Sequence, residues 1–116
     1  MKPKRVIVEP FRFPIYIATS DESWEELDLD RSAMEGAVLT FKGKMYVALP
    51  EDYEEYVTWH EAHHVARMLN GAHGVPTDAD EHEADCYLQE HVVRLIKSVY
   101  AKDLAKALKK KGDVNV

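Results

Sequence analysis

Cysteine is nearly absent from this chain of 116 residues, and its scarcity excludes two classes of small protein. The single residue, Cys86, has no partner for an internal disulfide, so the chain is not a disulfide-stabilised scaffold. A cysteine-based zinc finger is excluded for the same reason. One free cysteine fits a reducing compartment, which makes the cytoplasm the expected location, and we expect Cys86 to be a small buried hydrophobic residue.

Long apolar runs are also missing, so the sequence predicts no transmembrane segment and no membrane partner. The basic residues 1–5 resemble the start of a signal peptide, but Glu9, Pro10, Arg12 and Pro14 interrupt the apolar stretch that should follow. A composition of 46% hydrophobic and 31% charged residues is typical of a globular protein in water.

Basic residues are fewer than acidic ones, and the formal net charge is -6. We therefore expect no nucleic acid as a partner. Lysines are concentrated in residues 102–111, where cations near the end of a helix offset its dipole. The length fits one compact domain, residues 1–116, that buries a core of its own.

The first half of the chain has the composition and alternation of β-strands. Gly43 can take the positive φ that a short hairpin connection needs, so we expect residues 42–44 to join two strands. Residues 20–30 fit either a short helix capped by Ser20 or an acidic loop. The predicted strands are Arg5–Val8, Pro14–Ala18, Ala37–Phe41 and Met45–Leu49.

The second half of the chain has helical spacing of its apolar residues. We predict one helix from about Asp52 to Leu69 and a second that begins near Asp78. Residues 102–111 either add a further amphipathic helix or prolong the second one. Leu104 and Leu108 stand four apart there, and we expect both to point inward.

The predicted first helix carries the motif with the most chemical content, residues 60–64. His60 and His64 are four apart, so both imidazoles can reach one metal ion from the same helix face. Glu61 lies about 100° further round the helix, where its carboxylate can take a proton from a zinc-bound water. The pattern predicts Zn²⁺ as the cofactor, His60 and His64 as ligands and Glu61 as the general base.

Catalytic zinc needs a third protein ligand, and the predicted second helix offers carboxylates at its start. Glu81 and Asp85 head the apolar stripe of that helix and should face inward, whereas Glu83 should point mostly to water. We therefore expect Glu81 to be the third metal ligand. Asp85 is then the acceptor for the free N–H of a ligand histidine, with His60 favoured over His64.

Glu81 also has a purely structural interpretation. Asp78 could cap the second helix while Glu81 returns to the backbone N–H of the cap, which is a capping box. In that case Glu83 or Asp80 would supply the third ligand. His63 points about 60° away from His60, so we expect it to face solvent or to pack rather than to bind the metal.

These residues resemble the gluzincin metallopeptidases, the thermolysin-like class in which His-Glu-x-x-His is followed by Glu-x-x-x-Asp. Met45–Leu49 followed by residues 58–61 also looks like the strand-then-helix core of the ImmA/IrrE-like family, whose downstream motif Glu-x-x-Ala-Asp is matched by Glu81, Ala84 and Asp85. The segment after Asp85 departs from that family, and no helix-turn-helix is evident.

The resemblance implies an α+β fold, a minimal zincin with a small, twisted, mostly antiparallel sheet packed on the helix of residues 60–64 and on a second ligand-bearing helix. It implies a zinc metallopeptidase that hydrolyses peptide bonds in a peptide or protein substrate. It further places the substrate backbone along an edge strand, Met45–Leu49.

Two questions remain open at the level of sequence. A donor to the transition-state oxyanion is needed besides zinc, and the sequence does not rank the candidates Tyr46, Tyr53, His73 and His82. The alternative function is a non-enzymatic zincin-fold binding or regulatory module in which zinc is structural or absent. Hydrolysis of a substrate other than a peptide is a third possibility.

Overall fold

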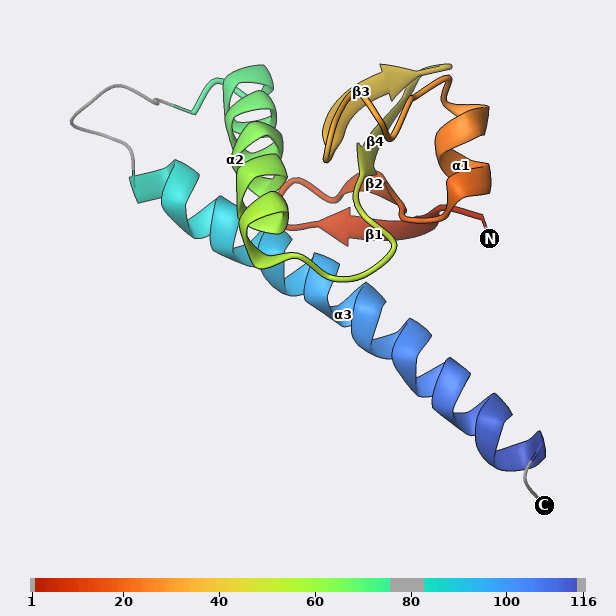
Figure 1. Ribbon diagram of the computed structural model, residues 1–116. Helices are drawn as coiled ribbons and strands as arrows, with labels where there is room; N and C mark the ends of the chain where they lie inside the picture. The colour runs from red at the N-terminus through yellow and green to blue at the C-terminus, as the bar shows by residue number, and fades with distance from the viewer. Residues whose placement is uncertain (1, 76–82, 115–116) are drawn as a thin grey trace.

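The computed structural model describes residues 2–75 and 83–114, and these form an α+β fold in which helices pack on a sheet (Figure 1). This confirms the predicted α+β class. The strands are β1 (Lys4–Val8), β2 (Phe13–Ala18), β3 (Ala37–Phe41) and β4 (Lys44–Ala48), and the helices are α1 (Asp21–Glu26), α2 (Glu55–Ala72) and α3 (Glu83–Val114).

The sheet is mixed, with strand order β1-β2-β4-β3. Strands β1 and β2 pair antiparallel, as do β3 and β4, but the central pair of β2 and β4 is parallel. The prediction that Met45–Leu49 is an edge strand is therefore wrong, because β4 lies between β2 and β3. The edges of this sheet are β1 and β3.

A buried tryptophan holds the parallel strands together at their ends. The Trp24 Nε1–H donates to the carbonyl oxygens of Ala18 and Leu49, at 3.2 and 3.1 Å; Ala18 is the last residue of β2, and Leu49 directly follows β4. Helix α1 carries Trp24, and the Ser20 side chain caps this helix by accepting from the backbone N–H of Ser23. The helical alternative for residues 20–30 is thus the one that forms, over six residues.

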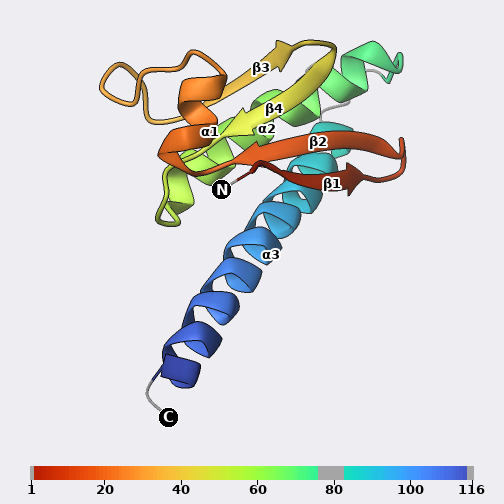
Figure 2. The same ribbon diagram turned by 90° about the vertical axis from the view of Figure 1, so that its right-hand side faces the viewer.

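Alternation along the central strands separates the two faces of the sheet. Ile15 and Ile17 of β2 and Met45 and Val47 of β4 are buried in one core with residues of α2 and α3. On the opposite face the neighbouring rings of Tyr16 and Tyr46 lie 5.3 Å apart and stay partly exposed. Figure 2 shows the strands in front of α2 and α3, so the two helices cover the same face.

Two glycines decide where local elements turn or end. Lys42 and Gly43 both have positive φ, 51° and 78°, which gives a two-residue hairpin between β3 and β4 instead of the three-residue connection predicted. Helix α2 continues to Ala72, past the predicted end at Leu69, because Asn70 is buried and hydrogen-bonded to Asp85. The helix stops where Gly74 takes a φ of 72°.

Helix α3 continues past the body of the protein into solvent (Figures 1 and 2). The radius of gyration is 15.4 Å, against about 13 Å for a compact chain of this length. Leu104 and Leu108 are 62% and 60% exposed, so the prediction that they point inward is wrong. The predicted burial of Cys86 is also wrong, since it is exposed on α3. None of the helices in the described residues is long and apolar enough to cross a membrane.

Tyrosine contacts attach α3 to the body of the protein near the point where its exposed part begins. The Tyr100 hydroxyl donates to the carbonyl oxygen of Pro50, and the rings of Tyr100 and Tyr53 meet edge to face at 5.4 Å. Burial raises the pKa of Tyr100 far above its ordinary value. Burial, together with the hydrogen bond to Glu55, raises the pKa of Tyr53 to about 12.

These pKa values predict a loss of stability at alkaline pH. The folded state holds both protons more tightly than the unfolded chain, so their contribution is complete below about pH 10 and falls as the pH rises through the folded pKa values. Tyr100→Phe should lower the free energy of unfolding at pH 7 by about 1 kcal/mol, because Pro50 loses its donor. Denaturant unfolding from pH 7 to 11 should show a shallower alkaline decline for Tyr100→Phe than for wild type. An equal decline would contradict the assignment.

Candidate metal centre and cleft

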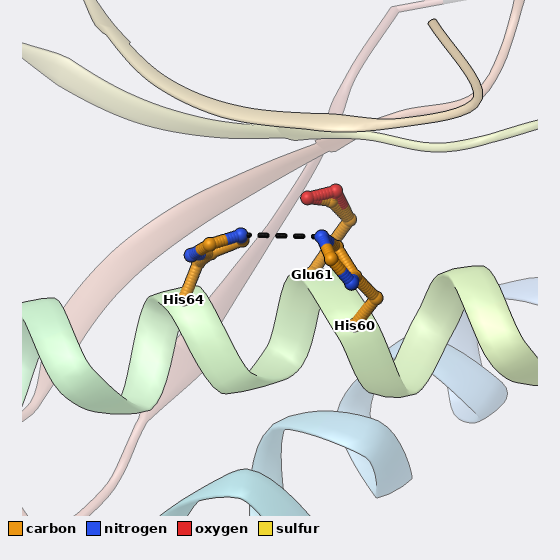
Figure 3. Close-up of side chains that lie close together, drawn as sticks. All are labelled: His60, Glu61 and His64. Carbon is orange, nitrogen blue, oxygen red and sulfur yellow. Dashed lines mark hydrogen bonds between the residues drawn. The ribbon is translucent and has the colours of Figure 1, made fainter.

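The two histidines and the glutamate of the motif lie together in the middle of α2 (Figure 3). The possible ligand atoms of His60, Glu61 and His64 all lie within 4.8 Å of one another. Their side chains leave the helix on the side where the strands lie, while α3 passes on the other side in this view. The predicted grouping of these three residues is therefore present in the folded chain.

The spacing of the two imidazoles fits a zinc ion. The Nε2 atoms of His60 and His64 are 3.3 Å apart, and the rings are inclined by 77°. Two nitrogens bound to tetrahedral zinc at 2.0–2.1 Å stand about 3.4 Å apart. Both imidazoles are exposed, so an ion could reach them from solvent without a change in the backbone. The donor set is thus suited to zinc by both chemistry and distance.

Glu61 differs from its neighbours because it is buried, with 4% of its surface exposed. Burial raises the pKa of this carboxyl group, while His60 and His64 act in the opposite direction. A carboxylate taken out of water accepts a proton more readily than one at the surface. Glu61 also lines the cleft described below, although only 4% of its surface is exposed.

Gly36 is the residue that makes room for Glu61. A Cβ atom at position 36 would lie 2.9 Å from Val57 Cγ1, 3.1 Å from the Ala48 carbonyl oxygen and 3.1 Å from Glu61 Cγ. The backbone that leads into β3 can therefore approach α2 only because residue 36 has no side chain. This close approach holds the Glu61 side chain between the sheet and the helix.

A cleft of about 440 Å³ opens between this segment and α2. Its lining is formed by His60 and Glu61, together with Glu35, Gly36, Tyr56 and Val57. Sequence reasoning missed Glu35, Gly36 and Tyr56. Tyr56 could have been found, because it stands one turn before His60 on the same helix face. Glu35 and Gly36 had no such signal, since only the chain path of β3 brings them to α2.

Asp85 is buried, with 4% of its surface exposed, as its predicted inward position requires. Its Oδ1 accepts a hydrogen bond from Asn70 Nδ2 at 2.7 Å, and its Oδ2 lies 3.5 Å from Arg67. The hydrogen bond that Asp85 accepts thus comes from the end of α2 and not from His60. In this arrangement Asp85 fixes the start of α3 against α2.

The proposed third ligand lies outside the described residues. Glu81 belongs to the segment 76–82, as do the alternative ligand Asp80 and the possible cap Asp78. Glu83 is exposed at the first turn of α3, as predicted. His63 is exposed next to His64, with the two ring centroids 6.3 Å apart, so it faces solvent as expected.

The predicted oxyanion donors within the described residues lie away from the cleft. Tyr46 packs on Tyr16 on the sheet face opposite the helices. Tyr53 donates to Glu55 at 2.8 Å, and His73 stacks on Phe11 at the far end of α2. None of the three lines the cleft as the described residues define it, and His82 belongs to the segment outside them.

Zinc affinity tests the metal centre. Wild type should bind one zinc ion, and His60→Ala or His64→Ala should weaken binding by more than about 100-fold, because each removes a direct ligand. His63→Ala is the matched control and should bind like wild type. Isothermal titration calorimetry measures all four affinities. Equal zinc binding by His60→Ala and wild type would contradict the assigned ligands.

Gly36→Ala tests the packing that positions Glu61. The added methyl group collides with Val57 and the backbone of Ala48, so the free energy of unfolding should fall by about 1–3 kcal/mol. Gly71→Ala is the control, since nothing lies within 4 Å of its Cβ position, and it should be neutral or stabilising. Denaturant unfolding compares the two variants. A loss for Gly71→Ala as large as that for Gly36→Ala would argue against this packing account.

Comparison of the chain with known protein families, with curated proteins and with solved structures finds no match. The description of the site therefore depends on three observations on the chain itself: the 3.3 Å between the two imidazole nitrogens, the buried Glu61 and the cleft beside them.

Proposed function

We propose that the chain is a zinc-dependent metallopeptidase in which His60, His64 and Glu81 hold the metal and Glu61 is the general base. The observation that carries the proposal is the 3.3 Å separation of the His60 and His64 Nε2 atoms beside a cleft that Glu61 also lines. Zinc, when bound, supplies a Lewis acid that polarises a carbonyl group and lowers the pKa of a bound water to about 7.

Glu61 performs the proton transfers of hydrolysis. Its carboxylate takes a proton from the attacking water and later returns it to the leaving amine, so the group ends each cycle in its starting state. Burial supports this function, because it raises the pKa of Glu61 toward the range in which a carboxyl group both accepts and donates protons. Gly36 keeps the side chain in place between β3 and α2.

The substrate backbone pairs with the edge strand β3 in this proposal. The resemblance to zincins implies an edge strand as the binding strand, and β3 is the sheet edge that lies beside α2. β3 begins at Ala37, immediately after Gly36 in the lining of the cleft. A peptide added to this edge passes close to His60 and Glu61, and its backbone hydrogen-bonds to an unpaired strand.

The alternative function is a non-enzymatic zincin-fold binding or regulatory module, and the feature that supports it is the exposed end of α3. Its free end presents Leu104 and Leu108 to solvent, and such a surface suits contact with another protein. The cleft beside Glu61 favours the enzyme, because a structural zinc site has no need of a carboxylate that faces an accessible space.

Peptide cleavage by zinc-loaded protein separates the two functions. Wild type should cleave a library of internally quenched peptides, and Glu61→Gln should bind zinc but cleave about 100-fold or more slowly, because it cannot accept the proton. Glu90→Gln, which changes an exposed carboxylate on α3, should match wild type. Undiminished cleavage by zinc-loaded Glu61→Gln would rule out the assigned base, and no cleavage by zinc-loaded wild type would favour the binding module.

A further inference from the structure

The cleft that His60 and Glu61 line is also lined by groups that the proposed chemistry does not use. Its volume of about 440 Å³ falls within the range of small-ligand sites, and Glu35, Tyr56 and Val57 contribute to its lining. Tyr56 and Val57 belong to the first turns of α2, whereas Glu35 belongs to the segment before β3. Because they share the cleft with His60 and Glu61, these residues are placed to contact a substrate bound there.

Tyr56 is held at this cleft with its ring accessible. The side chain is 61% exposed, in contrast to the paired rings of Tyr16 with Tyr46 and of Tyr53 with Tyr100. Interaction with the Glu35 carboxylate raises the pKa of Tyr56 above its ordinary value. Tyr56 of α2 and Glu35 of the segment before β3 line the same cleft.

The cleft carries one acidic side chain, Glu35, that the proposed metal chemistry does not use. No lysine or arginine is found among the described residues that line it. A cation placed here would meet the Glu35 carboxylate and the face of the Tyr56 ring, two groups that attract ammonium and guanidinium ions.

We propose that Glu35 and Tyr56 form a subsite for a cationic side chain, lysine or arginine, of the peptide substrate. Val57 supplies an apolar wall for the methylene groups of such a side chain, which pack on apolar surface while the charged end stays near a carboxylate. An acidic side chain in the same place would lie against Glu35 and be disfavoured. This inference rests on the proposed peptidase function, because it assigns the substrate class of that site.

The test compares peptides that differ only in one residue beside the cleaved bond: lysine, its neutral analogue norleucine, or glutamate. Zinc-loaded wild type should show a kcat/KM at least 10-fold higher for lysine than for norleucine, and the lowest value for glutamate. Glu35→Gln should bring the lysine-to-norleucine ratio close to one, and Glu35→Lys should favour glutamate over lysine. Tyr56→Phe should keep more of the ratio than Tyr56→Leu, because it keeps the ring.

Glu25→Gln, an exposed change on α1, is the control and should keep the wild-type ratio. A wild-type ratio near one, or a lysine preference that survives Glu35→Gln, would overturn the subsite even if the peptides are cleaved. Fluorescence anisotropy of the same peptides with zinc-loaded Glu61→Gln separates binding from cleavage. Lysine-selective binding that needs Glu35, with no cleavage by wild type, would support the subsite and refute the peptidase. The absence of both binding and cleavage would refute both proposals.

Discussion

The arrangement of this protein depends on the packing of α2, which has to fit against the sheet and α3 at the same time. Ala62 and Ala66 of α2 are fully buried, and their small side chains let neighbouring elements come close. On another stripe of the helix, Glu61 stands between Val57 and Val65 at helical spacing, so a carboxylate occupies a position that the core would otherwise fill with an apolar residue. The fold accommodates it because Gly36 leaves space beside it and because the cleft gives the carboxyl group an open side.

The same packing connects the ends of α2 to the rest of the chain. Asp85 receives the Asn70 hydrogen bond and sets where α3 begins, and Gln89 donates to the Trp59 carbonyl oxygen at 3.0 Å one turn further on. The proposed third ligand, Glu81, is four residues before Asp85 in the sequence. The contact between Asp85 and Asn70 therefore contributes to any metal site that includes Glu81 by fixing the helix that follows it, even though Asp85 does not contact His60.

The features that depend on residues close together in the sequence were the ones that the sequence pattern predicted. The strands, the hairpin at Gly43 and the grouping of His60, Glu61 and His64 all follow from residues close in sequence. The parallel pairing of β2 with β4 did not follow, because it joins two strands that are far apart in the chain. The spacing of Leu104 and Leu108 correctly marks one apolar helix face, but spacing cannot tell whether another element covers that face.

In the site, too, only part of the arrangement follows from local sequence. The two glutamates that line the cleft differ in their surroundings and therefore need not act alike. Glu61 is buried and its pKa is raised, which suits a group that exchanges protons with the reacting atoms. Glu35 is exposed in the lining of the cleft, which suits a group that attracts a cation. The motif found Glu61 because its helical position relative to the histidines is fixed. Glu35 is 25 residues before His60 (60 minus 35) and reaches the cleft only through the path of the chain into β3. In the proposed enzyme, the residues that would select the substrate thus come together through the fold, whereas the proposed proton-transfer group is positioned by one helix.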